Sequence, residues 1–245
     1  MTADLSPIDS SLRLSHICRD NGLPLSDDQV NLLRRYVELL REWNAKVNLI
    51  SRRDEENIWW SHILHSLSIL FFVTPGEEMR LLDLGTGGGL PGIPLAILRN
   101  DLHITMLDSI RKKTVAVQDM LDKLSLPAAR VETGRAEELS AKSGWSGTFD
   151  IVVARAVAPL EDLLRWSRPL LRPARGERVQ HRLAEPAGRP LSTPLLLALK
   201  GGDLAGEIQR AQQRARSAVI TSNTLVFPGS EELGLEDKRL VTVEF

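Results

Sequence analysis

The stretch LLDLGTGGGLPG, residues 81–92, decides the fold. An apolar run reaches Asp83, and glycines then follow at alternate positions, at Gly85, Gly87 and Gly89. Residues without a Cβ let the backbone approach a ligand closely and adopt positive φ where a strand turns back into a helix. The stretch therefore predicts a buried strand, a glycine loop that holds a nucleotide, and a helix that leaves the loop.

The glycine loop fits two motifs. From Gly87 it matches the Gly-x-Gly-x-x-Gly fingerprint of dinucleotide-binding enzymes, which by itself is a weak signal. From Asp83 it resembles motif I of the S-adenosylmethionine-dependent methyltransferases, with Gly85 directly after the strand. We favour the second motif, because Gly87 follows the strand too late for the fingerprint. The Asp83 carboxylate can also offset the positive charge of S-adenosylmethionine.

Strands and helices alternate after the loop. We expect strands at residues 103–107, 129–133 and 149–155, and helices at residues 93–98 and 110–124. This alternation predicts a doubly wound, mostly parallel sheet, which binds ligands outside the carboxyl ends of its strands. One cleft should therefore bring together residues from five segments, namely Gly85, Asp108, Ala136, Glu137 and Arg155.

Asp108 has two predicted roles. It follows Asp83 by about 25 residues, close to the roughly 20-residue spacing of the acid that binds a ribose hydroxyl pair. It also precedes a predicted helix, where an acid gains about 0.3–1 kcal/mol from the helix dipole. The two roles are compatible, and ribose binding is the one we favour.

The composition is that of a globular protein. Of the 245 residues 42% are hydrophobic and 26% are charged, so the chain can bury a full core and is not disordered. The formal net charge is −1, so any nucleic acid must bind local basic patches and not a global field. Cys18 is the single cysteine, and the sequence has no membrane-length apolar run and no signal-peptide pattern. We expect a cytoplasmic monomer without membrane contact.

Residues 1–72 have the apolar periodicity of helices packed ahead of the sheet. Ser26 and Gln29 form a capping-box pattern at the start of one of them. His62 and His65 have the spacing of a metal pair, but no carboxylate or cysteine cluster accompanies them. We therefore expect a polar histidine face near the cleft and no metal site.

Further segments extend the pattern well beyond the glycine loop. They are NAKVNLIS (44–51), HILHS (62–66), LLDLGTGGGLPGIPLAIL (81–98), MLDS (106–109), RAEEL (135–139), FDIVVARAVAPL (149–160) and LALKG (197–201). Together they resemble the glucose-inhibited division protein B family, from about Leu25 to the C-terminal strand. That family comprises bacterial methyltransferases of the small-subunit ribosomal RNA, which methylate guanine N7 at position 527, in the 530 loop of 16S rRNA.

The resemblance implies a Rossmann-like class I S-adenosylmethionine-dependent methyltransferase fold at residues 73–245, with residues 1–72 as an N-terminal helical extension. It implies S-adenosylmethionine as the cofactor and the 16S rRNA of the small ribosomal subunit as the partner. The family's cofactor positions are occupied by Gly85, Leu90, Ala136, Glu137 and Arg155. The spacing argument adds Asp83, Gly87 and Asp108 to the same pocket. Arg155 is the residue that we expect to be indispensable for catalysis.

Two features depart from the family. His65 stands where the family commonly has an aspartate. Residues 174–193, with Arg175, Arg178, Arg182 and Arg189, are inserted where the family passes almost directly into the LALKG strand. We expect a solvated flexible loop there, with contact to rRNA phosphates as the alternative.

The available chemistry narrows the target atom. Methylation of cytosine C5 needs a cysteine nucleophile, and Cys18 is far in sequence from every cleft motif. Enzymes that methylate exocyclic amines usually carry a Pro-Pro-aromatic turn after the fourth strand, where this chain has residues 154–159, ARAVAP. Guanine N7 presents an unprotonated lone pair. Its methylation needs alignment and no general base.

RNA contacts should come from small basic groups around the cleft. The candidates are Arg52, Arg53, Arg111, Lys112, Lys113, Arg135 and Lys200. Each has a solvated surface charge as its alternative interpretation. Two rival functions stay open: an NAD(P)-dependent dehydrogenase, which shares the sheet and the glycines, and a noncatalytic RNA-binding protein that retains the cofactor fold.

Overall fold

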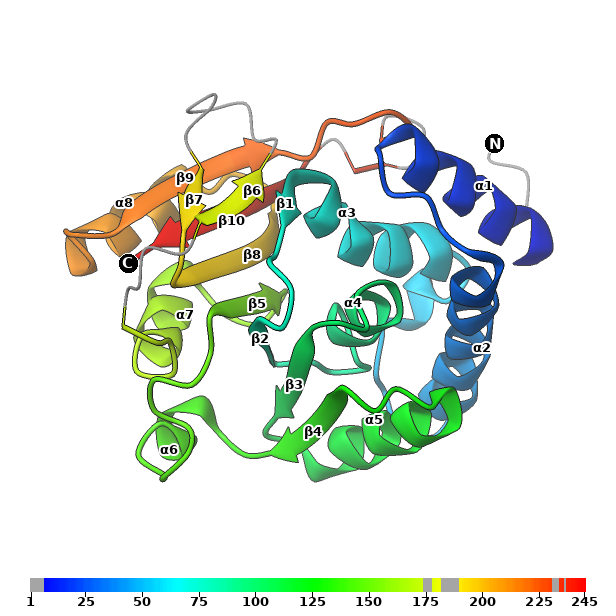
Figure 1. Cartoon of the computed structure of the whole chain (residues 1–245), viewed down its shortest axis with the longest axis horizontal. Coiled ribbons are helices and arrows are strands. Elements are labelled where there is room, and N and C mark those ends of the chain that lie inside the picture. The colour runs from blue at the N-terminus through cyan, green and yellow to red at the C-terminus, as the bar shows by residue number, and fades with distance from the viewer. Residues whose placement is uncertain (1–6, 174–177, 182–189, 231–233, 236) are drawn as a thin grey trace.

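A central seven-stranded sheet organises the molecule (Figure 1). The computed structural model describes residues 7–173, 178–181, 190–230, 234–235 and 237–245. The strand order is β4-β3-β2-β5-β8-β10-β9, and β10 runs antiparallel to both of its neighbours. The strands are β2 (Arg80–Leu84), β3 (His103–Asp108), β4 (Ala129–Thr133), β5 (Ile151–Arg155), β8 (Leu195–Gly201), β9 (Val219–Thr224) and β10 (Lys238–Glu244).

This order confirms the doubly wound, mostly parallel sheet that the sequence predicts. The strands β4, β3, β2, β5 and β8 are parallel. The chain winds in one direction from β2 through β3 to β4, and then returns to place β5 on the other side of β2. Ligands bind at such a switch point, outside the carboxyl ends of the strands.

Helices cover both faces of the sheet (Figure 1). One apolar cluster joins one sheet face to α4 and α5, and a second joins the other face to α6, α7 and α8. The bounds are α4 (Gly92–Leu98), α5 (Arg111–Leu124), α6 (Ala136–Leu139), α7 (Leu160–Ser167) and α8 (Ala205–Arg214). Apolar side chains on both strand faces explain why the parallel strands read as continuous apolar runs.

The N-terminal region is helical, as predicted. It contains α1 (Pro7–Asp20), α2 (Asp27–Asn44), the short 3-10 helix η1 (Arg52–Asp54), the π-helix η2 (Ile58–Leu64) and α3 (His65–Phe72). The predicted capping box is present, because Ser26 Oγ accepts from the Gln29 N–H and Gln29 Oε1 accepts from the Ser26 N–H. No helix in the described part of the chain is long and apolar enough to cross a membrane.

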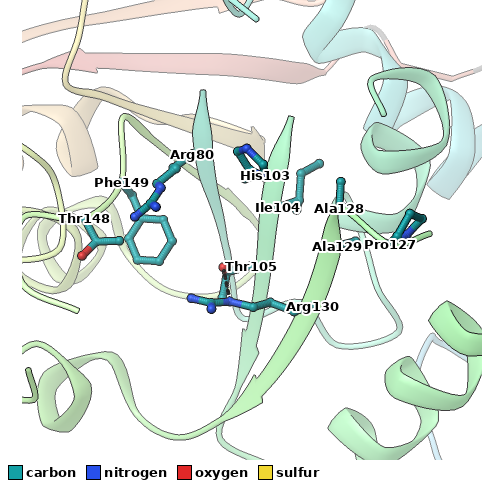
Figure 2. A pocket seen from close by; sticks show the side chains of 10 residues that line it. All are labelled: Arg80, His103, Ile104, Thr105, Pro127, Ala128, Ala129, Arg130, Thr148 and Phe149. Atoms are coloured by element: carbon teal, nitrogen blue, oxygen red, sulfur yellow. Dashed lines mark hydrogen bonds between the residues drawn. The ribbon is translucent and has the colours of Figure 1, made fainter. Parts of the chain in front are cut away.

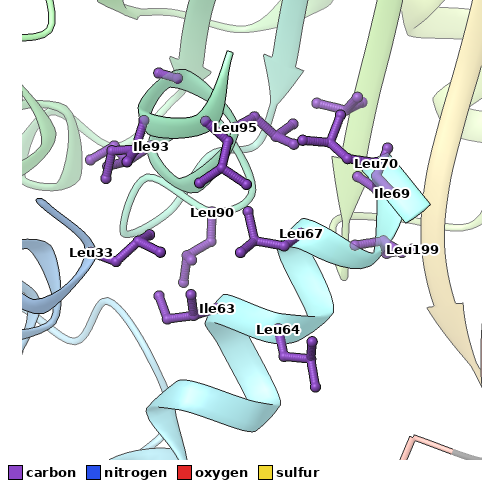
Figure 3. Packing of buried hydrophobic residues seen from close by; sticks show 14 of the residues in the cluster. Leu33, Ile63, Leu64, Leu67, Ile69, Leu70, Leu90, Ile93, Leu95 and Leu199 are labelled. Atoms are coloured by element: carbon purple, nitrogen blue, oxygen red, sulfur yellow. The ribbon is translucent and has the colours of Figure 1, made fainter. Parts of the chain in front are cut away.

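The N-terminal helices share one continuous core with the sheet. Figure 3 shows Ile63 and Leu67 packed near Leu90 and Ile93, which belong to the glycine loop and α4. Because this core crosses residue 72, the sequence-based boundary between a helical extension and a methyltransferase domain stays a prediction.

The inserted segment differs from the expected flexible loop. Its described residues form β6 (Arg178–His181) and β7 (Leu191–Ser192), which join β1 (Val73–Thr74) in a second sheet. The physical reason is apolar burial, since Val179 and Leu191 are buried in the common core. The RNA contacts predicted for this segment rest on arginine side chains that the structure does not describe, namely those of Arg175, Arg178, Arg182 and Arg189.

Candidate functional site

A cavity of about 290 Å³ lies at the carboxyl ends of β2, β3 and β4, at the switch point of the sheet. Gly85, Asp108, Ala136 and Glu137 line it. The structure thus brings together four of the five residues of the predicted cleft. Arg155 lines a neighbouring pocket, and Ala156 lines both.

The glycine loop has the backbone geometry that only glycine adopts without strain. Gly85, Gly87 and Gly89 have φ values of 74°, 57° and 91°. The Gly85 and Thr86 N–H groups donate to the Leu107 carbonyl at 2.8 and 2.9 Å, which ties the loop to the end of β3. A Cβ on Gly85 would lie 2.6 Å from a Val157 methyl group, whereas one on Gly87 would meet nothing closer than 3.8 Å. A Cβ on Gly87 would thus be in ordinary van der Waals contact with the Leu49 carbonyl, and Gly87, predicted at the cofactor, does not line the cavity.

Asp83 lies beneath the glycine loop. It is fully buried, and its Oδ2 atom accepts from Thr86 Oγ1 at 2.6 Å and from the Gly92 N–H at 2.9 Å. Oδ1 has no hydrogen-bond partner among the described residues. Asp83 does not line the cavity, so its predicted part in cofactor binding would act through the loop or as a charge behind it.

Burial raises the pKa of Asp83 to about 7, against the lowering effect of Thr86, Gly92 and Arg155. The folded protein therefore holds a proton that the unfolded chain releases near the ordinary aspartate pKa of 3.8. We predict that stability falls by up to about 1.4 kcal/mol per pH unit as the pH rises between these two values. Asp83→Asn should flatten this fall. Urea denaturation of both proteins from pH 5 to pH 8 tests it, and parallel curves would contradict it.

Asp108 organises the loop and the next helix. Its Oδ2 atom accepts from the Gly87 N–H at 3.0 Å, and Oδ1 accepts from the Ile110 N–H at 2.8 Å. The second bond ties the carboxylate to the N-cap residue of α5, ahead of the first turn, and the predicted gain from the helix dipole stays a prediction. Each carboxylate oxygen has a second lone pair, so the same side chain retains acceptors for ribose hydroxyls, and that role remains a prediction.

The N-terminal helices support the loop from behind, which the sequence analysis missed. The buried Tyr36 hydroxyl donates to the Gly88 carbonyl at 2.9 Å. A Cβ on Gly88 would lie 2.9 Å from Leu40 and 3.2 Å from Leu49. Leu90, predicted at the cofactor, is 3% exposed and packs in the core behind the loop, away from the lining of the cavity.

A second pocket, of about 460 Å³, adjoins the first at the ends of β5 and β8. Arg155 lies in its wall, where Nη1 donates to the Ser61 carbonyl at 3.1 Å and to His62 Nδ1 at 2.8 Å. Burial lowers the pKa of Arg155, while Tyr36, Asp83 and Asp54 raise it. Because a guanidinium stays protonated in proteins, Arg155 is a half-buried cation with further N–H donors in the wall of the second pocket.

The predicted RNA-binding residues divide into three groups. Arg52 and Arg53 on η1, and Arg111 and Lys112 at the start of α5, are exposed. Lys113 and Arg135 line the first cavity. Lys200 lines the second pocket, where its side chain is 14% exposed, donates to the Ala158 carbonyl at 2.8 Å and pairs with Glu207. Lys200 is therefore engaged within the protein, unlike the first group.

A third cavity, of about 260 Å³, lies at the amino ends of the strands, on the opposite side of the sheet from the glycine loop (Figure 2). Arg80, His103 and Arg130 line it, and Arg130 Nε donates to Thr105 Oγ1 at 3.0 Å. These residues lie at or near the amino ends of β2, β3 and β4. Since open α/β sheets bind ligands at the carboxyl ends, this cavity is not the candidate reaction site.

Cys18 lies in α1, and burial raises its pKa to about 12. A thiol with this pKa carries almost no thiolate at neutral pH. The structure thus agrees with the sequence-based exclusion of cysteine-dependent methylation at cytosine C5.

Comparisons with known proteins agree with the geometry. The family described as rRNA small subunit methyltransferase G matches residues 29–182, more than half of the chain. The ribosomal RNA small subunit methyltransferase G of Chlorobium luteolum is 38% identical over 220 residues, which cover 90% of this chain and 80% of the relative. That of Chlorobaculum tepidum is 39% identical over 200 residues, which cover 81% and 80%.

Among solved structures, TrmN from Thermus thermophilus aligns with a TM-score of 0.52 and 15% identity. The alignment covers 74% of this chain and 48% of that one, and it bears on the fold alone. With the strand order, these findings confirm the predicted class I S-adenosylmethionine-dependent methyltransferase fold.

Proposed function

The chain belongs to the rRNA small subunit methyltransferase G family, and from this premise we propose that it methylates the 16S rRNA of the small ribosomal subunit. We further propose S-adenosylmethionine as the donor and guanine N7 at position 527 as the acceptor. The observation that carries the proposal is that two cavities adjoin at Ala156, one beside the glycine loop and one beside Arg155. We expect the protein to act as a cytoplasmic monomer.

The residues of the first cavity fit S-adenosylmethionine, which supplies an electrophilic methyl group when bound. The loop places Gly85, which has a positive φ and no Cβ, in the cavity wall, where its backbone can approach a ligand. Asp108 offers carboxylate oxygens for the ribose hydroxyls, and Glu137 adds an exposed acid at the cavity wall. These two acids favour a cationic ligand over a pyrophosphate.

The second pocket would hold the target nucleotide. Guanine N7 carries a free lone pair, so the protein needs to align N7 with the methyl group and to exclude water. Alignment of this kind accounts for about 7–11 kcal/mol of barrier lowering in well-oriented reactions. Arg155 is fixed by Ser61 and His62, and its remaining N–H donors would hold the nucleotide in the productive position.

Exposed cations at the start of α5 would hold the RNA backbone. We predict that Arg111→Ala combined with Lys112→Ala weakens RNA binding and lowers the slope of log affinity against log salt by about 0.7 for each lost phosphate contact. Both side chains are exposed and neither lines the first cavity, so cofactor affinity should not change. Lys123→Ala, at the far end of the same helix, is the matched control. An unaltered salt slope in the double variant would count against phosphate contacts at the start of α5.

The proposed reaction is tested with small subunits from a strain that lacks the modification. Labelled S-adenosylmethionine, these subunits and the purified protein are incubated, and the rRNA is digested to nucleosides. The label should appear in 7-methylguanosine. Label in another nucleoside would refute the N7 assignment, and no transfer, with subunit binding retained, would favour the noncatalytic alternative. Stabilisation by NAD(P) and not by S-adenosylmethionine in a thermal melt would favour the dehydrogenase.

A further inference from the structure

Two imidazole nitrogens at the wall of the second pocket lack hydrogen-bond partners. His62 and His65 line this pocket, and each is only 6% exposed. Within the described part of the chain, neither Nε2 atom has a partner. Because an unsatisfied buried polar atom is costly, a ligand that supplies the missing partners explains both atoms at once.

His62 presents a hydrogen-bond donor. A guanidinium only donates, so His62 Nδ1, which lies 2.8 Å from Arg155 Nη1, must be the acceptor. Burial and the charge of Arg155 lower the pKa of His62 to about 3, so the ring is neutral at pH 7 and carries its proton on Nε2. Asp54 Oδ2 lies 3.7 Å from Nε2, beyond hydrogen-bond distance. The Nε2–H group therefore has no partner among the described residues and is closed to solvent, so a base must displace part of the pocket wall to reach it.

His65 presents the opposite polarity. The backbone of Ser61 hydrogen-bonds its ring and raises its pKa, as a carbonyl acceptor does. Since Nε2 is the nitrogen without a partner, the proton lies on Nδ1. Burial, with Arg155, Lys238 and His62 as further causes, lowers the pKa of His65 to about 3. Nε2 thus carries a lone pair at neutral pH that has no partner among the described residues and that, like His62 Nε2, is closed to solvent.

We propose that His62 and His65 are the residues that select guanine, an inference that rests on the function proposed above. The His62 Nε2–H group would donate to guanine O6, and His65 Nε2 would accept the neighbouring N1–H. Adenine presents an amino donor in place of O6 and a bare nitrogen in place of N1–H, so both contacts would be mismatched. This edge lies beside N7 and leaves N7 free to face the first cavity.

The hydrogen bonds to Arg155 and Ser61 are what make the pair selective. An imidazole with a free choice of tautomer can donate or accept, and would serve either purine. Here Arg155 prevents proton transfer to His62 Nδ1, and the Ser61 carbonyl holds the proton on His65 Nδ1. The order of donor and acceptor is therefore set before the base arrives.

The test uses small subunits reconstituted with 16S rRNA that carries guanine, inosine or 2-aminopurine at the target position. Inosine keeps O6 and N1–H but lacks the exocyclic amine, whereas 2-aminopurine keeps that amine and N7 but lacks O6 and N1–H. With the unaltered protein, kcat/KM for inosine should stay within about tenfold of guanine. The value for 2-aminopurine should fall by at least about a hundredfold, as when a site built for hydrogen bonds meets an analogue without them.

A substitution at His65 tests whether the selectivity for guanine comes from this side chain. In His65→Phe, which keeps a planar ring but no acceptor, the guanine to 2-aminopurine ratio should shrink at least about fivefold. The ratio is taken on one preparation, so the fraction of folded protein cancels. His103→Phe, a half-exposed histidine at the opposite sheet edge, should keep the original ratio. If His65→Phe does not fold, the same ratio measured in His65→Leu, which also lacks an acceptor, takes its place.

Each outcome is decisive. The inference is overturned if inosine fails as badly as 2-aminopurine, if 2-aminopurine matches guanine, or if the ratio survives in the His65 variant. No methylation of guanine itself would instead be a failure of the proposed function, which the unsubstituted subunit reports separately.

Discussion

Replacing Arg155 with methionine should lower the rate of methyl transfer by about 100- to 1000-fold, the usual cost of removing a preorganised donor at a reacting centre. Arg155 is fixed by the Ser61 carbonyl and His62 Nδ1 beside the second pocket, and it does not line the cavity at the glycine loop. The affinity for S-adenosylhomocysteine should therefore change less than about threefold, well below one tenfold step in affinity. Single-turnover kinetics and calorimetric titration measure the two effects.

Two further variants show whether the loss of rate is specific to the guanidinium of Arg155. Arg155→Lys should recover little activity, because one ammonium group cannot reproduce the planar fork that serves Ser61, His62 and a substrate together. Arg165→Met, at an exposed arginine on α7, should behave like the unaltered protein. A parallel loss of cofactor affinity in Arg155→Met would instead place Arg155 at the cofactor, as the family resemblance implies, and would contradict its assignment to the target nucleotide.

Gly85→Ala should weaken S-adenosylhomocysteine binding by at least about tenfold, or 1.4 kcal/mol. The φ of 74° at this position costs a residue with a Cβ about 1–2 kcal/mol. The added methyl group would also lie 2.6 and 2.8 Å from the two Val157 methyl groups. Val157 lines the same cavity, so its displacement changes the shape of the binding site. Calorimetric titration gives the affinity.

Gly144→Ala is the matched control for Gly85→Ala. Gly144 has a similar φ of 83°, but a Cβ there would meet nothing within 4 Å. The control should show the strain as a lowered melting temperature and leave cofactor affinity unchanged. Equal affinity losses in the two variants would mean that backbone strain, and not crowding at the cavity, accounts for the effect.

Much of the cofactor cavity could be predicted from local patterns. The apolar run into Asp83, the alternating glycines and the acid at Asp108 each lie at the end of a strand, and parallel strands bring their carboxyl ends to one edge. Short stretches of sequence also predict the capping box at Ser26 and the order of strands and helices along the chain. Such features depend on neighbours along the chain.

The features that sequence reasoning missed depend on distant partners. Tyr36 reaches the Gly88 carbonyl, and Arg155 reaches His62, across 52 and 93 positions of sequence. Lys200 is predicted to bind RNA because it is a basic residue at the end of a strand. In the structure its side chain already pairs with Glu207 and donates to the Ala158 carbonyl. A lysine on a predicted surface and a lysine in an internal ion pair have the same local sequence signal.

The inserted segment shows the same limit. Its arginines and its length suggest a solvated loop, yet Val179 and Leu191 are buried and place two short strands beside β1. The few apolar residues scattered through this charged stretch give no periodicity that predicts a strand. The edge of β1, which receives the segment, lies about a hundred residues earlier in the chain.

We infer that the glycine loop seats S-adenosylmethionine with its methyl group directed toward the Arg155 pocket. A crystal structure with S-adenosylhomocysteine tests this placement. We expect an adenosine beside Gly85 and Ala136, its ribose hydroxyls on the Asp108 carboxylate, and its sulfur toward Ala156, where the two cavities adjoin. A ligand bound in the cavity of Arg80 and Arg130, or in the glycine cavity with its sulfur turned away from Ala156, would overturn this assignment of the cofactor site.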